Sequence, residues 1–200
     1  TADHFDYIII DEVHHATATT YRSIIDYFQP DFLLGLTATP DRSDQHDVRA
    51  LFDDHCAFQV GLGFGISKKL LTPFHYIGRL DPIDYKKIPW KRNHFEEEPL
   101  NQQLCTEERM KILHSLWTEH PATRTLVFCS SIVHADSVGA YLNQQGINTA
   151  VLHSQSHSDP RAENIDALNK GDIECICVVD LFNEGIDIPA LDRIIMLRPT

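Results

Sequence analysis

Two adjacent carboxylates, Asp11 and Glu12, follow a dense apolar run at residues 6–10. A continuous β-branched run of this kind is typical of a strand buried on both faces of a parallel sheet. Ligands of open α/β sheets bind at the carboxyl ends of such strands. One carboxylate there can hold Mg²⁺ while its neighbour polarises a water for phosphoryl transfer. Acids at strand ends are often only solvated, so the pair alone leaves both interpretations open.

The elements around this pair predict one βαβ unit. Residues 19–28 carry apolar side chains at helical spacing, and Pro30 ends the pattern. A second buried strand is expected at residues 32–36, joined to the first by a right-handed crossover. Because Thr37 and Thr39 follow that strand, they should face the same crevice as the two carboxylates.

The second half of the chain predicts a longer βαβ series. Ser130 and Ser131 end its first strand, where their hydroxyl and amide groups could bind a phosphate. Alternatively they cap the helix that follows, and the two roles are compatible. Strands are expected at residues 125–129, 149–152, 173–179 and 193–197, and helices at 106–120, 133–145 and 161–169.

Between the two series lies a basic, proline-punctuated segment without sustained periodicity. Residues 66–95 hold seven Lys or Arg and two Asp, in a chain whose net charge is −12. Aromatic residues among these cations suit single-strand binding, with Lys86, Lys87, Lys91 and Arg92 as candidate nucleic-acid contacts. The favoured alternative is that the aromatics dock the segment onto the flanking modules. The domain prediction is a first module at 1–65, a basic linker at 66–100 and a second module at 101–200.

Bulk composition narrows the class of protein. The net charge of −12 disfavours a chain that binds nucleic acid over its whole surface. No apolar run approaches the roughly 20 residues of a membrane span, and no secretion leader is visible. The five cysteines form no CxxC pair, which predicts free thiols and a reducing, cytoplasmic location. Cys175 and Cys177 should face the same side of a strand.

Four segments together resemble the motifs of superfamily 2 helicases and translocases. The string Asp11-Glu12-Val13-His14 is a DExH box similar to motif two, and Leu-Thr-Ala-Thr-Pro at residues 36–40 resembles motif three. Residues 127–131 resemble motif four, and residues 178–189 resemble motif five. The order and spacing match the family over essentially the whole chain.

The resemblance implies an α/β fold of two RecA-like parallel-sheet modules, the first incomplete, and ATP with Mg²⁺ as cofactors. Asp11 would then hold Mg²⁺ and Glu12 would position the hydrolytic water. His14 would link the nucleotide crevice to the second module, and Thr37 and Thr39 would couple nucleotide state to the nucleic-acid face. In the second module, Gly185 and Asp187 would lie at the nucleotide.

The resemblance also implies that the phosphate-binding loop and the arginine-finger motif of the family fall outside residues 1–200, so the fragment itself is expected to be inactive. Residues 71–76 and 88–90 resemble a bacterial subgroup associated with restriction or DNA repair, in which a nuclease-like domain or subunit accompanies the motor. DNA is therefore the expected partner. The alternative is a non-catalytic nucleic-acid or protein-binding module on the same fold.

Overall fold

The computed structural model of the chain describes residues 1–17, 19–39, 48–155, 158–179 and 188–198. The chain divides into two compact units, unit 1 (Thr1–Ile77) and unit 2 (Gly78–Thr200). This division falls inside the predicted linker, whose own limits at 66 and 100 stay predictions. Within the described ranges, no helix is long and apolar enough to cross a membrane.

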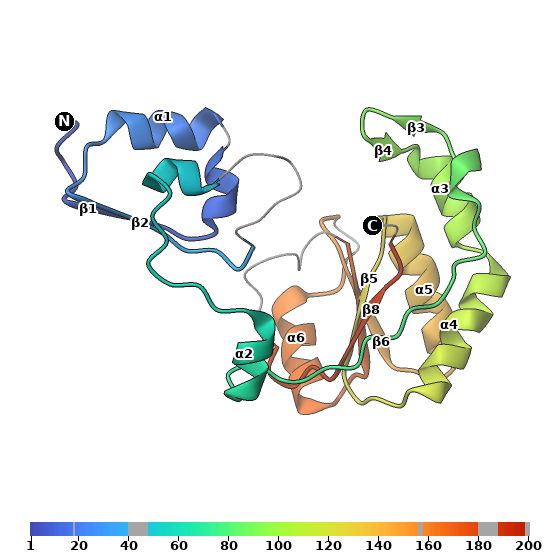
Figure 1. The fold of residues 1–200 in the computed structure, drawn as a ribbon. Coiled ribbons are helices and arrows are strands. Elements are labelled where there is room, and N and C mark those ends of the chain that lie inside the picture. The colour runs from blue at the N-terminus through green and yellow to red at the C-terminus, as the bar shows by residue number, and fades with distance from the viewer. Residues whose placement is uncertain (18, 40–47, 156–157, 180–187, 199–200) are drawn as a thin grey trace. The chain divides into compact units, whose positions relative to one another are not determined.

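Unit 1 is built around a two-stranded parallel sheet (Figure 1). Strand β1 (Tyr7–Ile10) pairs with β2 (Phe32–Gly35) over all four residues. Helix α1 (Thr19–Tyr27) connects them, which confirms the predicted strand, helix and strand. The unit also contains η1 (Val13–Thr17), η2 (Val48–Phe52) and α2 (Leu62–Ser67).

Among the described residues of unit 1, one face of this sheet is covered and the other is exposed. Val13 and Val48 are buried and pack with partly buried neighbours from β1, α1 and η2. Gly35 allows η2 to lie close, because a Cβ at this position would come within 2.5 Å of the Phe52 ring.

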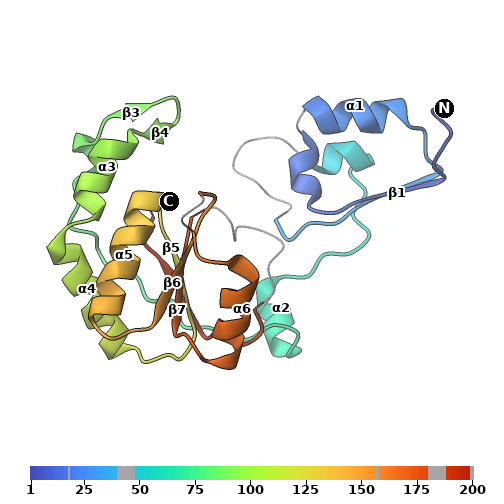
Figure 2. The same ribbon diagram turned by 180° about the vertical axis from the view of Figure 1, so that it is seen from behind.

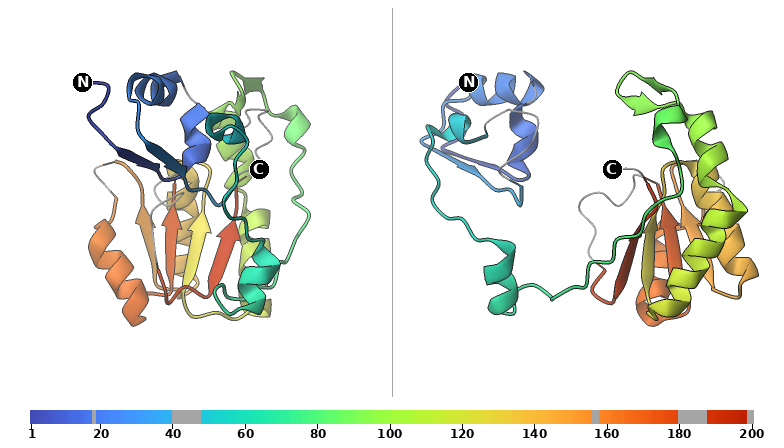
Figure 3. Two further views of the ribbon diagram at one scale, coloured as in Figure 1. Left: turned by 60° about the vertical axis from the view of Figure 1, so that its left-hand side comes forward. Right: turned by 45° about the vertical axis from the view of Figure 1, so that its right-hand side comes forward.

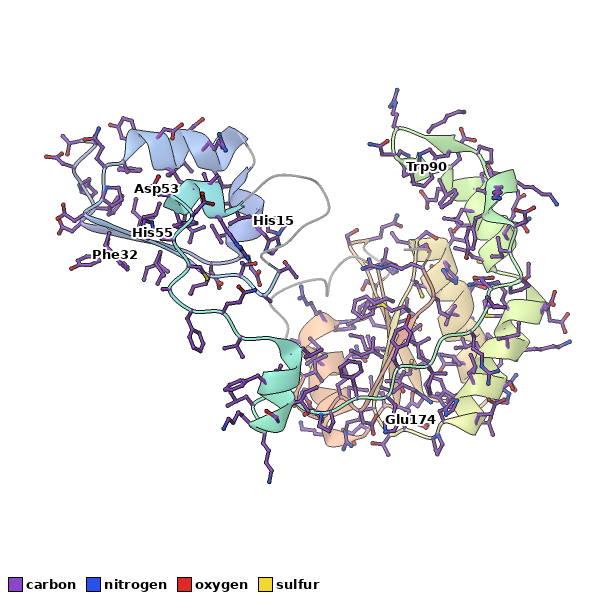
Figure 4. All side chains as sticks on the ribbon, in the orientation of Figure 1. His15, Phe32, Asp53, His55, Trp90 and Glu174 are labelled. Atoms are coloured by element: carbon purple, nitrogen blue, oxygen red, sulfur yellow. The ribbon has the colours of Figure 1, made fainter. Side chains whose placement is uncertain are left out.

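The prediction that the first strand is buried on both faces is wrong. Tyr7 is 71% exposed, Ile9 is 64% exposed and Phe32 is 48% exposed, and Phe32 projects from β2 away from α1 (Figure 4). The β-branched run does form a strand. The described part of unit 1 supplies helices for only one side of it, so the residues alternate between half-buried and exposed.

Unit 2 is built on a parallel sheet of four strands in the order β6-β7-β5-β8, which the left view of Figure 3 shows side by side. Every neighbouring pair is parallel, so the predicted α/β fold is confirmed. The strands begin within two residues of the predicted positions. They are β5 (Thr125–Phe128), β6 (Thr149–Leu152), β7 (Cys175–Val178) and β8 (Arg193–Met196).

Helices cover both faces of this sheet, as Figures 1 and 2 show. Helices α4 (Glu107–Glu119) and α5 (Ile132–Gln144) lie on one face, and α6 (Arg161–Lys170) lies on the other. Alternate residues of the central strands separate into two apolar clusters, one packed against α4 and α5 and one against α6. Burial on both faces explains why β5 and β7 are continuously apolar.

The cysteines are free thiols, as the sequence predicts. Cys175 and Cys177 lie on one side of β7 and are buried with Cys129 in the α5-facing cluster. Hydrogen bonding of the Cys177 thiol with Cys129 and Cys175, together with burial, raises the pKa of Cys177 well above its ordinary value. The Cys177 thiol is therefore a protonated packing group rather than a nucleophile.

Residues 78–104 belong to unit 2, and from Tyr85 onward they form regular elements rather than an extended linker. They form η3 (Tyr85–Lys87), the strands β3 (Trp90–Lys91) and β4 (His94–Phe95), and helix α3 (Glu97–Leu104). A small core of Ile88, Leu100 and Leu104 holds them together, with Tyr85 and Phe95 packed against it. Tyr85 and Phe95 thus pack on a core formed largely by their own segment, and docking onto the flanking modules stays a prediction.

Candidate functional site

The candidate site of unit 1 lies at the carboxyl edge of the β1–β2 sheet. Asp11 and Glu12 directly follow β1, and Thr37 comes two residues after β2. Because Ile10 pairs with Gly35 in the parallel register, both strands end at the same edge. A hydrogen bond from Val13 N to Leu36 O ties the two segments together just beyond the strands.

A short chain of polar contacts joins the predicted residues at this edge. His14 Nδ1 lies 2.9 Å from Thr37 Oγ1 and 3.2 Å from Glu12 Oε2. The nearby carboxylate favours a proton on Nδ1, which both oxygens can then accept. Thr39 N donates to Thr37 Oγ1 at 3.0 Å. These contacts form one continuous chain within unit 1, running from Glu12 through His14 and Thr37 to Thr39.

The two carboxylates differ from His14 in exposure. The His14 side chain is 9% exposed, whereas that of Glu12 is 44% exposed, and Asp11 is also exposed. His14 is held firmly by its burial and contacts, while the acids can reach a ligand in solvent. A buried histidine that orients an exposed carboxylate is an arrangement suited to acid–base work on a bound water.

The backbone at Glu12 is unusual. Its φ is 49°, in the left-handed region that residues other than glycine rarely adopt. Glu12 N donates to Asp11 Oδ1 at 2.9 Å, which turns the chain sharply after β1. The two neighbouring carboxylates therefore have different partners, the Glu12 amide for Asp11 and His14 for Glu12.

Ser130 and Ser131 follow β5 in unit 2, and the helix-capping role is confirmed for Ser131. Its Oγ accepts a hydrogen bond from His134 N at 3.1 Å and donates to Asn101 Oδ1 at 2.5 Å. Ser131 is 5% exposed, so its hydroxyl is already committed. Ser130 Oγ is buried and has no hydrogen-bond partner among the residues that the structure describes.

His134 is a buried polar residue beside this pair that sequence reasoning missed. Its side chain is fully buried, and its Nδ1 accepts a hydrogen bond from Ser130 N at 3.3 Å. Burial and the positive charge of Arg109 lower the pKa of His134 to about 4. The imidazole is therefore neutral at pH 7. A histidine in the first turn of a helix carries no sequence signal for such burial.

The remaining predicted residues lie elsewhere. Lys86, Lys87, Lys91 and Arg92 are exposed on the η3 and β3–β4 region of unit 2, so they belong to a different unit from Glu12. Gly185 and Asp187 fall outside the described residues. No group of three or more His, Cys, Asp or Glu that could hold a metal occurs in the ranges that the structure covers.

Comparison with known proteins gives matches along most of the chain. Residues 1–42 match the family described as "Type III restriction enzyme, res subunit", and residues 104–200 match "Helicase conserved C-terminal domain". "Putative ATP-dependent helicase IRC3" of Saccharomyces cerevisiae is 27% identical over 96% of this chain and 29% of that protein. "Type I restriction enzyme EcoAI endonuclease subunit" of Escherichia coli is 28% identical over 67% of this chain and 19% of that protein.

A solved structure shares the fold. The fragment structure of a putative HsdR subunit of a type I restriction enzyme from Vibrio vulnificus YJ016 superposes with a TM-score of 0.71 at 21% identity, covering 100% of this chain and 38% of that one. The chain spans less than a third of the two curated relatives named above. The modules are RecA-like, and the chain is similar over most of its length to ATP-dependent helicases and to restriction-enzyme subunits.

Proposed function

We propose that this chain forms the inner part of an ATP-dependent helicase or translocase that acts on DNA. The observation that carries the proposal is the contact of His14 with both Glu12 and Thr37. Glu12 orients the attacking water and accepts its proton. Because His14 is buried and touches both residues, a change in the position of the carboxylate is passed on to the segment that follows β2.

Asp11 fits the ligand requirements of Mg²⁺. Its Oδ1 accepts the Glu12 amide, and in the described chain its Oδ2 has no recorded partner. Mg²⁺ in nucleotide sites is usually held by one or two carboxylates together with phosphate oxygens and waters, so a dedicated cluster of protein ligands is not required. Bound Mg²⁺–ATP would supply the phosphoryl group and neutralise its developing charge.

Unit 2 contributes the second set of contacts in this proposal. By resemblance, Gly185 permits close approach of the backbone to the nucleotide, and Asp187 contacts it. The Ser131 hydroxyl is committed to the helix cap and to Asn101. The Ser130 hydroxyl has no partner in the described chain but is buried, so it would bind a phosphate only after this turn rearranges. Thr37 and Thr39 relay nucleotide state toward the bound strand.

The parent protein also works with a nuclease domain or subunit in this proposal. A relative named as a type I restriction endonuclease subunit supports that association. Five free cysteines support a reducing, cytoplasmic location.

The test is ATP hydrolysis by the full-length protein with and without single- and double-stranded DNA. Glu12→Gln should lower the DNA-stimulated rate by roughly 10²- to 10⁴-fold, the usual contribution of a general base, while binding of Mg²⁺–ATP is retained. Asp26→Asn, which removes an exposed carboxylate on α1, is the matched control and should leave the rate unchanged.

Two results would contradict the proposal. The first is an unchanged rate in Glu12→Gln, which would remove Glu12 from the chemistry. The second is DNA binding with no nucleotide turnover under any condition, which would favour a non-catalytic binding module on the same fold.

A further inference from the structure

The β3–β4 hairpin of unit 2 is a small, rigid projection. It stands at the outer end of α3, away from the four-stranded sheet, as Figures 1 and 2 both show. Arg92 and Asn93 form its two-residue turn, and both have positive φ values, 50° and 63°. Two left-handed residues in succession are the signature of a type I′ turn, which matches the twist of the flanking strands.

Aromatic packing anchors the hairpin from below. Trp90 pairs across the strands with Phe95, edge to face, with ring centroids 4.6 Å apart. Phe95 in turn lies 5.7 Å from the Tyr85 ring and packs on the small core of residues 88–104. Phe95 and Tyr85 are both occupied by these packing contacts. Trp90 is different, because it stays 58% exposed although it lies over a fixed ring (Figure 4).

The hairpin is also a local concentration of positive charge. Residues 85–95 contain four Lys or Arg and no carboxylate, in a chain of net charge −12. Lys87 is paired with Asp84, and Lys91 is paired with Glu96, both at exposed positions. Such surface pairs are weak and easily exchanged. Lys86 and Arg92 are exposed, and within the described part of the chain neither has an ion-pair partner.

The acids that follow the hairpin do not neutralise this charge, because they have a structural role of their own. Glu97 and Glu98 occupy the first turn of α3, where carboxylates are favoured by the unpaired amides and the dipole of the helix. Their presence is explained by the start of α3. Arg92 at the turn and Lys86 in η3 have no ion-pair partner in the described part of the chain, and that difference points to a ligand that carries negative charge.

We propose that the hairpin binds single-stranded nucleic acid, with a base stacked on Trp90 and phosphates held by Lys86 and Arg92. An exposed ring on a rigid base offers a flat surface at little entropic cost, and flanking cations track the backbone. A duplex keeps its bases stacked on each other, so it gains nothing from Trp90. This proposal deepens the proposed function, because it gives the motor a strand contact outside its motif residues.

The test is equilibrium binding of fluorescein-labelled oligo(dT) to this 200-residue chain without nucleotide. Trp90→Leu should weaken binding roughly tenfold, as expected for loss of one base–aromatic stack, and Trp90→Phe should restore much of it. Lys86→Gln with Arg92→Gln should reduce the slope of log K against log salt by about 1.4, since each phosphate contact on a single strand contributes about 0.7.

Lys111→Gln with Lys170→Gln is the matched control, because both lysines are exposed and paired one helical turn away with Glu107 and Asp166. This variant loses the same charge and should keep nearly all of the affinity. Circular dichroism establishes that every variant is folded. In addition, oligo(dT) should quench the fluorescence of the wild-type chain and not that of Trp90→Phe, since the other tryptophan, Trp117, stacks under Arg193.

Three outcomes would overturn the proposal: no binding of oligo(dT), equal losses in the hairpin and control variants, or Trp90→Leu binding as tightly as the wild type. A preference for duplex over oligo(dT) would also contradict it. Because nucleotide is absent, these results do not depend on Glu12 chemistry, so binding with no ATP hydrolysis in the full-length protein would leave the hairpin proposal intact and remove only the motor.

Discussion

At the scale of single residues, two of the histidines with buried side chains play opposite parts. His14 is buried beside a carboxylate and a hydroxyl that it can hold in place. His134 is buried in unit 2 with only a backbone amide on its Nδ1, and its pKa of about 4 reflects first its burial and then Arg109. One histidine is placed to connect groups, and the other is placed to stay neutral.

The titration of His134 predicts a pH dependence of stability. The unfolded chain binds a proton at this position near pH 6.5, whereas the folded chain binds it only near pH 4. The free energy of unfolding should therefore fall as the pH drops from about 6.5 to about 4, by at most about 3 kcal/mol for this group. Urea denaturation across this range measures it. His134→Gln should show a flatter profile than the wild type, and parallel profiles would contradict the assignment.

The residues of the site were accessible to sequence reasoning where a strand end marks them. Asp11 and Thr37 could be placed at one edge because each follows an apolar run, and parallel strands share their carboxyl edge. The contact of His14 with Glu12 could not be derived, because it depends on the left-handed turn at Glu12. The burial of His134 depends on residues distant in the sequence, so no local pattern signals it.

At the scale of elements, a polar clamp fastens the start of unit 2 to α4. Arg109 is 11% exposed and donates to Asp81 Oδ2 at 2.8 Å and to Leu104 O at 3.0 Å. Tyr85 OH donates to the same Asp81 oxygen at 2.7 Å. Burial raises the pKa of Asp81, but the bonds from Tyr85 and Ile83 and the charge of Arg109 outweigh it and lower the pKa. Burial and the Asp81 carboxylate raise the pKa of Tyr85 to about 12.

Arg109→Met should lower the free energy of unfolding of unit 2 by roughly 2 kcal/mol, the usual size of hydrogen bonds to a charged group. Arg79→Met is the control, because Arg79 is half exposed and makes a surface pair with Glu119; it should cost below about 1 kcal/mol. The pKa of Asp81 is lowered below 3.8. The difference in the free energy of unfolding between wild type and Arg109→Met should therefore have its full size above pH 3.8 and become smaller as the pH falls further. Equal costs for the two arginines would contradict the clamp.

Elements with a clear period were predictable, and those without one were not. The helix at 107–119 and the strands of unit 2 follow apolar patterns that the sequence displays. Helix α3 was missed because Pro99 interrupts it, yet Pro99 is its third residue, where the backbone amide has no intrahelical partner and proline is tolerated. The short helix α2 was missed because it holds two glycines among six residues.

At the scale of the whole molecule, the two units differ in how much core they possess. The buried apolar residues of unit 1 are Val13 and Val48 in the ranges that the structure describes, whereas unit 2 has two clusters on either side of its sheet. Amide hydrogen exchange should therefore be slower in β5 and β7 than in β1 and β2. Equal protection of the two sheets would show that unit 1 gains stability from contacts other than its own core.

At position 12 the left-handed backbone favours glycine for stability, whereas the proposed chemistry requires the glutamate side chain. Glycine would relieve a cost of about 1 kcal/mol there, so Glu12→Gly should unfold at a urea concentration no lower than Glu12→Gln does. A library of this chain screened only for resistance to protease would then drift toward glycine at position 12. A library screened for nucleotide turnover would retain glutamate. The difference in glutamate frequency at position 12 between the two libraries would measure how strongly turnover depends on this side chain.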